Sequence, residues 1–178
     1  LAVREALYGE RHRNVAQICK NIGDTLAAIG DCNSALLHLQ RCLSITEVLL
    51  GPKHPKTAAA YHNLGRVCRM SGDITAALEH HQKAQAILES ELGPSHPDTQ
   101  KACACVAQIL HEQGKFVEAL ALYQKGRECR EMTMGTNHPG IASTYSNIGR
   151  VYQAQGDLES ALQHFQMALT VEQASMGP

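Results

Sequence analysis

A five-residue motif, Gly-x-x-His-Pro, returns at a fixed interval of 42 residues and limits what this chain can fold into. Full copies occupy residues 51–55, 93–97 and 135–139, a degraded copy starts at Gly9, and a further one begins at Gly177. A second glycine series keeps the same step: Gly30, Gly72, Gly114 and Gly156. A period of this length indicates a stack of one supersecondary unit rather than a single globular core. We therefore expect function to lie in a surface that stacking builds.

The period divides the 178 residues into four repeats and one partial unit. We predict repeats at 11–52, 53–94, 95–136 and 137–178. Residues 1–10 align with 43–52, so they are predicted to be the last turns of a preceding repeat helix. We interpret the whole as one solenoid domain and as a fragment of a longer protein.

Each repeat is predicted to hold two helices, which we call helix A and helix B. In the second repeat, apolar residues recur every three or four positions from Ala58 to Cys68 and again from Ile74 to Leu88, as in amphipathic helices. Pro55 suits the first turn of helix A, and Gly72 suits its end. Small residues predict close helix contacts, on helix A at Gly23, Gly65, Ala107 and Gly149, and on helix B at Ala35, Ala77, Ala119 and Ala161.

Bulk charge, hydropathy and cysteine usage exclude several classes of protein. The net charge of −1 gives no general attraction to nucleic acid or acidic membranes, and no apolar run is long enough to predict a membrane span. Six of the seven cysteines align with apolar residues or glycine in other repeats. We predict that these six are buried free thiols in a reducing compartment, the cytoplasm. Cys105 is the exception, because it aligns with asparagines.

The residue pattern argues against a metal site, a cofactor or catalysis. The link histidines His12, His54, His96 and His138 stand one repeat apart, whereas tetrahedral ligands must converge within roughly 2.0–2.3 Å of one ion. We predict that these histidines cap and pack the links. A catalytic thiol needs a base and an orienting group, and nothing fixes such a geometry around Cys105, even with His62 or His111 nearby. The chain is predicted not to be an enzyme.

The helix pattern is similar to a known repeat signature. Tyr61-x-x-Leu64-Gly65-x-x-Cys68, followed by Ala77-x-x-x-His81, resembles the tetratricopeptide repeat, as do the corresponding stretches from Cys19 and Tyr145. The 42-residue form, with Gly-x-x-His-Pro in the link, resembles the repeats of kinesin light chains. The resemblance implies an all-α fold, a right-handed superhelical solenoid of helix–turn–helix repeats.

The resemblance also implies that the A helices line a concave face, with the residue before the Leu-Gly pair pointing into it. That position holds asparagine in three of the four repeats. An asparagine amide can donate to and accept from a peptide backbone, and arginine suits carboxylates. The alternative is a solvated polar face. The predicted peptide-binding residues are Lys20, Asn21, His62, Asn63, Arg66, Arg69, Lys101, Asn147 and Arg150.

We therefore predict a non-catalytic scaffold of the cargo or adaptor type that binds an extended, acidic peptide segment. No nucleic-acid partner and no direct membrane contact are expected. The alternative is a structural spacer or self-association module of a larger signalling protein, which would associate through its exposed solenoid ends. A groove binder should gain thermal stability from an acidic peptide, whereas a spacer should not.

Overall fold

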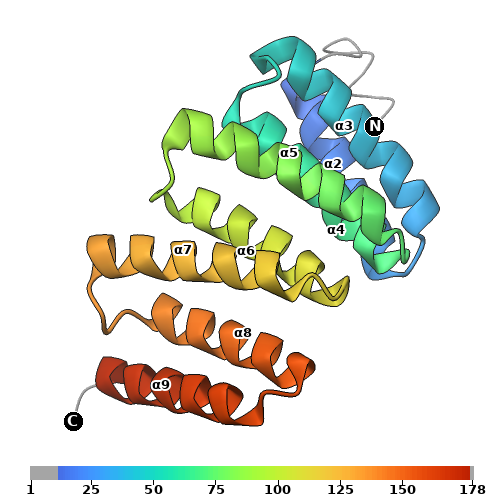
Figure 1. Cartoon of the computed structure of the whole chain (residues 1–178). Coiled ribbons are helices and arrows are strands. Elements are labelled where there is room, and N and C mark those ends of the chain that lie inside the picture. Colours follow the sequence, from blue (N-terminus) through green and yellow to red (C-terminus); the bar gives the residue numbers. More distant parts are fainter. Residues whose placement is uncertain (1–11, 177–178) are drawn as a thin grey trace. The chain divides into compact units, whose positions relative to one another are not determined.

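The computed structural model describes residues 12–176, and the regular elements of these residues are all helices (Figure 1). The predicted all-α fold is confirmed. The expectations for residues 1–10, for the motif copy at Gly9 and for Gly177 lie outside the described residues. Helix A of the four repeats is α2 (Arg13–Ala28), α4 (Pro55–Met70), α6 (Pro97–Glu112) and α8 (Pro139–Gln155). Helix B is α3 (Cys32–Leu50), α5 (Ile74–Leu92), α7 (Phe116–Met134) and α9 (Leu158–Met176).

The chain forms two compact units, residues 1–93 (unit 1) and residues 94–178 (unit 2). In the described part of unit 1, α2 packs on α3, α3 on α4 and α4 on α5, and α2 also touches α4. In unit 2, α6 packs on α7, α7 on α8 and α8 on α9. Each helix B between two A helices of one unit therefore contacts both of them.

The repeated link motif sets where the helices end and begin. Gly51, Gly93 and Gly135 follow the B helices with φ of 92°, 84° and 80°, a backbone conformation that glycine adopts at little cost. Each A helix then starts after the motif histidine, whose Nδ1 accepts the backbone N–H two residues later at 3.0–3.2 Å. The interpretation of these histidines as helix caps is confirmed.

A single capping histidine should contribute measurably to stability. We expect His54→Ala to lower the free energy of unfolding by about 1 kcal/mol, because the N–H of Lys56 loses its acceptor. His54→Asn should restore most of that loss, since an asparagine oxygen can accept the same bond. Urea denaturation compares the two variants with Lys53→Ala, a change in the same link that touches no cap. Equal losses for the alanine and asparagine variants would contradict the capping role.

The B helices use a different cap. Asp31, Asp73 and Asp157 each accept the backbone N–H three residues later through Oδ1, at 2.9–3.1 Å. In the third repeat the same position is Lys115, and α7 begins without a side-chain cap bond. Helix starts in this chain are therefore fixed by local side-chain chemistry at three of the four A–B turns.

Small residues allow helices A and B of one repeat to touch. A β-carbon built on Gly65 would lie 2.7 Å from Cδ2 of His81, and one on Gly149 would lie 2.9 Å from Cε1 of Phe165. Both distances are shorter than carbon atoms tolerate, so the A helices approach the B helices at these glycines as predicted. The facing alanines of the B helices are buried as well.

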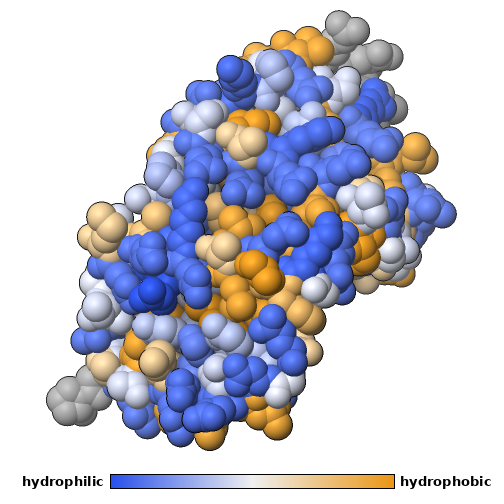
Figure 2. Space-filling view, in the orientation of Figure 1, coloured by the Kyte–Doolittle hydropathy of each residue, from blue (hydrophilic) through white to orange (hydrophobic). Residues whose placement is uncertain are grey.

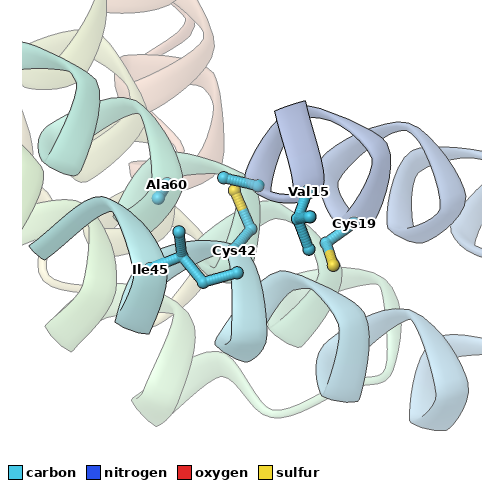
Figure 3. Close-up of a cluster of buried hydrophobic side chains, with 6 residues drawn as sticks. Val15, Cys19, Cys42, Ile45 and Ala60 are labelled. Carbon is cyan, nitrogen blue, oxygen red and sulfur yellow. The ribbon is translucent and has the colours of Figure 1, made fainter. Parts of the chain in front are cut away.

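Cysteines fill part of the core. Figure 3 shows Cys19 and Cys42 beside Val15, Ile45 and Ala60 in a buried cluster contributed by α2, α3 and α4. Four of the seven free thiols are buried, and the other three, which are Cys32, Cys105 and Cys129, are half-buried. The prediction of burial is therefore wrong for two of its six cysteines, Cys32 and Cys129. Cys32 is the first residue of α3, where a side chain is covered on fewer sides. Cys129 aligns with the buried Ile45, but its own side chain stays partly exposed.

We expect a thiol reagent to modify the half-buried cysteines before the buried ones. Burial raises the pKa of the Cys42 thiol, against the opposing hydrogen bond of Thr46, and thiolate is the reactive form. We expect Cys32 and Cys129 to react with a maleimide before Cys19 and Cys42 in the folded protein. Peptide mapping after brief labelling measures the order, and denatured protein provides the control for intrinsic reactivity. Early modification of Cys19 would show that this cluster opens readily.

Candidate functional site

Unit 1 carries a cavity of about 530 Å³ between its two A helices. The first half of α2, the last half of α3 and the first half of α4 supply its lining residues. Three alanines and the C-terminal end of α3 give the cavity an apolar surface, made by Ala16, Ala59, Ala60, Leu49 and Leu50. Leu49 and Leu50 are exposed. A volume of this size fits a side chain or a short peptide segment.

The polar lining of this cavity is cationic. Arg13, Lys20 and Lys56 lie around it, and the amides of Gln17 and Asn63 lie among them. Of the described residues, no carboxylate lines the cavity. An apolar surface surrounded by three cations and two amides favours a ligand that has both an apolar group and a negative charge.

A chain of ion pairs lies along the same face. Nζ of Lys20 is 2.9 Å from Oδ2 of Asp24, and Nη2 of Arg66 is 2.7 Å from Oδ1 of the same aspartate. Asp24 and Arg66 belong to neighbouring A helices, so the pair joins α2 to α4. Arg66 also donates from Nη1 to Sδ of Met70 at 3.6 Å. One arm of the Arg66 guanidinium is thus engaged by Asp24, and a ligand carboxylate would have to compete with that pair.

The other predicted residues of unit 1 fall into two groups. Asn63 lines the cavity, whereas Asn21 is exposed and accepts a hydrogen bond from Nε2 of Gln17 at 3.0 Å. His62 and Arg69 are half-buried and lie toward α5. The structure therefore brings Lys20 and Asn63 together at one cavity and places His62 and Arg69 beside a separate histidine cluster.

This cluster consists of His62 on α4 and of His80 and His81 on α5. The rings of His62 and His81 meet edge to face with centroids 4.9 Å apart, and Tyr61 lies 5.9 Å from His80. Burial lowers the pKa of His62 and of His80. Burial, with the nearby charges of His62, Arg69 and His80, lowers the pKa of His81 to about 4. At neutral pH these rings are uncharged, so they contribute packing rather than positive charge.

The remaining predicted residues lie in unit 2. Lys101 is 76% exposed, and its Nζ is 3.7 Å from Oδ1 of Asp98. Arg150 is exposed on α8 and Asn147 is half-buried on the same helix. Because these three residues belong to unit 2, the predicted set is divided between the two units, with six residues in unit 1.

Sequence reasoning did not identify Arg13, Gln17 and Lys56 as site residues. Arg13, Gln17 and Lys20 follow one another at helical spacing on one face of α2, and Lys56 and Asn63 do the same on α4. That periodicity was a usable signal. The contribution of Leu49 and Leu50 was not visible from the pattern, because it depends on where the end of α3 lies relative to the two A helices.

Comparisons with known proteins agree with this architecture. None of the helices between residues 12 and 176 has the length and apolar character needed to cross a bilayer. No curated protein matched the chain. Similar solved structures include a Podosopora anserina protein of kinesin light chain type with nearly identical TPR-like repeats (20% identity, TM-score 0.86), which aligns over 99% of this chain and 84% of that one.

Two other solved structures are similar at lower TM-scores. BtubC (BKLC) from P. vanneervenii aligns over 92% of this chain and 65% of its own, with 17% identity and a TM-score of 0.81. MamA aligns over 92% of this chain and 81% of its own, with 21% identity and a TM-score of 0.66. At these identities the likeness shows the fold, a solenoid of the tetratricopeptide type.

Sequence profiles decide the family. A tetratricopeptide repeat profile matches residues 38–90 and 100–174, and a second profile of the same repeat matches residues 15–56. These matches cover most of the chain and extend over both units. The chain belongs to the tetratricopeptide repeat family.

Proposed function

We propose that this chain is a non-catalytic scaffold, of the cargo or adaptor type, that binds an extended acidic peptide on the A-helix face of unit 1. Tetratricopeptide repeats are a fold typical of protein–protein interaction. The single observation that carries the proposal is the cavity between α2 and α4, with its apolar alanines and leucines and its cations Arg13, Lys20 and Lys56. A bound peptide would place an apolar side chain in the cavity and acidic residues on either side of it.

The polar groups of this face suit an extended backbone. Asn63 lies at the cavity, where its amide can donate to and accept from one peptide unit. Arg13 and Lys56 come from different helices, so acidic residues on both sides of an anchor could each meet a cation. Lys20 and Arg66 both pair with Asp24, so they contribute only if the ligand displaces or shares that carboxylate. Lys101, Asn147 and Arg150 would form a second contact region on unit 2. We place the protein in the cytoplasm, which its seven free cysteines support.

A peptide titration tests this function. The probe is a short extended peptide with a central leucine flanked by aspartate and glutamate, and its counterpart carries lysine at every acidic position. We expect the acidic peptide to bind and to raise the melting temperature, and its affinity to fall when salt is raised from about 0.05 to about 0.3 M. If neither peptide changes the melting temperature, the result favours the spacer or self-association alternative.

Two lysines of the same link provide a matched pair of variants. Lys56 lines the cavity, whereas Lys53, three residues earlier, does not. We expect Lys56→Glu to weaken the acidic peptide about tenfold, because like charges then face each other at the site. Lys53→Glu makes the same change in net charge away from the cavity, and it should weaken binding of the acidic peptide by at most about twofold. Equal losses for both variants, measured by fluorescence anisotropy, would indicate general attraction to the protein and no binding at this cavity.

A further inference from the structure

Hydrophilic side chains cover much of the visible surface of this protein (Figure 2), so a single surface ion pair says nothing about function. The carboxylate of Asp24 is different, because it joins two cations on two helices. Its Oδ2 lies 2.9 Å from Nζ of Lys20 on α2, and its Oδ1 lies 2.7 Å from Nη2 of Arg66 on α4. Each oxygen of this carboxylate thus has its own cation, as the oxygens of a bound ligand carboxylate would have.

These three charged groups lie beside the cavity of unit 1 and are open to solvent. Lys20 lines the cavity, and Arg66 stands one helical turn beyond Asn63, which lines it too. The side chains of Lys20, Asp24 and Arg66 are 39%, 33% and 35% exposed. A peptide that fills the cavity and continues toward the C-terminal ends of α2 and α4 would therefore reach both cations, and the Asp24 side chain has solvent into which it can turn.

The repeats of unit 2 stack without such an aspartate. The residue that aligns with Asp24 is Gln108, whose Nε2 donates to Oε1 of Glu112 on the same helix. Arg150 aligns with Arg66, and it has no ion-pair partner among the described residues. A stacked pair of repeats therefore does not require a carboxylate at this position, and half-exposed ion pairs contribute little to stability in general.

Asp24 changes what this face offers to an acidic ligand. Arg13 and Lys56 make the cavity positive. Lys20 and Arg66 would extend this positive charge along α2 and α4, but Asp24 cancels part of it. An acidic side chain that binds these two cations must replace Asp24, so one set of ion pairs breaks as another forms. The ligand therefore gains little affinity from this exchange, whereas it would gain more if the aspartate were absent.

We propose that Lys20 and Arg66 form a carboxylate-binding site, that Asp24 occupies this site in the free protein, and that an acidic side chain of the peptide replaces it on binding. This inference rests on the proposed function, and it names the residue that limits the affinity of unit 1 for acidic ligands. Asp24 lies four residues beyond Lys20, a rise of about 6 Å along α2, which two residues of an extended peptide span. The acidic residue that replaces Asp24 therefore lies about two positions from the side chain that fills the cavity.

Asp24→Asn tests the proposal, because it removes the charge and keeps the size of the side chain. The probe is an extended peptide with a central leucine and an aspartate two positions to either side of it, followed by fluorescence anisotropy. We expect Asp24→Asn to bind this peptide about tenfold more tightly than the unchanged protein does, and with a steeper dependence on salt, because two further cations then face the ligand. A peptide with asparagine in place of both aspartates should bind the two proteins equally.

Glu79→Gln is the matched control for net charge. It removes one carboxylate from an exposed position of α5 that does not line the cavity, and it should change the affinity for the acidic peptide by at most about twofold. Because Glu79 is exposed and Asp24 is half-exposed, circular dichroism should show both variants folded.

A second measurement tests the carboxylate site without any peptide. In Asp24→Ala, sodium acetate should shift the NMR resonance of the Arg66 Nε–H group relative to sodium chloride at the same concentration, because acetate takes the place of the missing carboxylate. The unchanged protein, in which Asp24 fills the site, should show no such difference. An Arg66 resonance in Asp24→Ala that responds equally to both salts would overturn the inference.

The peptide titration separates this inference from the proposed function. Equal affinity of the acidic peptide for Asp24→Asn and for the unchanged protein would overturn the inference and leave the proposed function in place. Weaker binding by Asp24→Asn would do the same, since Asp24 would then hold the two cations in their binding positions. If the acidic peptide binds neither protein, the inference and the proposed function are both overturned.

Discussion

Valine in place of Gly65 or Gly149 is expected to destabilise its repeat by about 3 kcal/mol. A β-carbon alone would already lie 2.7 Å from the His81 ring or 2.9 Å from the Phe165 ring. Both rings lie between helices A and B, so neither can turn away freely as an exposed side chain would. Glycine lowers helix propensity by about 1 kcal/mol relative to alanine, and the part of this that valine recovers does not offset the overlap.

Denaturant unfolding with a rescue variant separates this overlap from other causes. Ala59→Val places valine on an exposed position of the same helix and measures the cost of a β-branched side chain in this helix without the overlap. In Gly65→Val/His81→Ala the ring that valine would meet is removed, so the combined loss should be smaller than the sum of the two single losses. Strict additivity of the two changes would show that Gly65 and His81 are not in contact.

Helix ends could be predicted from the sequence because their chemistry is local. The glycine that takes a positive φ, the histidine that caps the next helix and the proline that follows it all lie within five residues. The close helix contacts at Gly65 and Gly149 could also be predicted from the sequence, since a small residue repeated on one helix face indicates a close neighbour. Each of these predictions needs only the register of a single repeat.

The candidate site was less predictable, because it depends on contacts between repeats. Asp24 and Arg66 stand 42 residues apart, and only the packing of α2 beside α4 lets them pair. The cavity exists because three alanines leave space where the end of α3 meets the two A helices. Sequence alignment of the repeats placed Lys20 and Asn63 on the A-helix face, but it could not show that Arg66 is already paired or that Leu49 and Leu50 line the same space.

Acid is expected to destabilise unit 1 through His81, which takes the place of Leu39, Tyr123 and Phe165 in the other repeats. This side chain is 3% exposed, and its Nδ1 atom has no hydrogen-bond partner among the described residues. The folded environment lowers the pKa of His81 to about 4, mainly by burial and then by the charges of His62, Arg69 and His80. In the unfolded chain a histidine has a pKa near its ordinary value of about 6.5.

The sign of the effect follows from these two pKa values. Above about pH 6.5 the ring is neutral in both states, so its full contribution to stability is present. Between about pH 6.5 and 4 the unfolded chain binds a proton that the folded chain does not, and the free energy of unfolding falls as pH falls. At pH 5 this loss is about 2 kcal/mol relative to pH 7.5, and it levels off near about 3 kcal/mol below pH 4. His62 and His80, whose pKa values are also lowered by burial, add losses of the same sign.

The variant that tests this prediction is His81→Leu, which installs the residue that faces Gly23 in the first repeat. We expect the difference in unfolding free energy between pH 7.5 and pH 5 to shrink by about 2 kcal/mol, because leucine binds no proton. Leu88→Ala is the matched control: it removes buried apolar volume from the same helix and should lower stability equally at both pH values. Should His81→Leu keep the pH dependence of the unchanged protein, the acid sensitivity of unit 1 would have to arise from groups other than this buried imidazole, and His81 would be protonated as readily in the folded state as in the unfolded one.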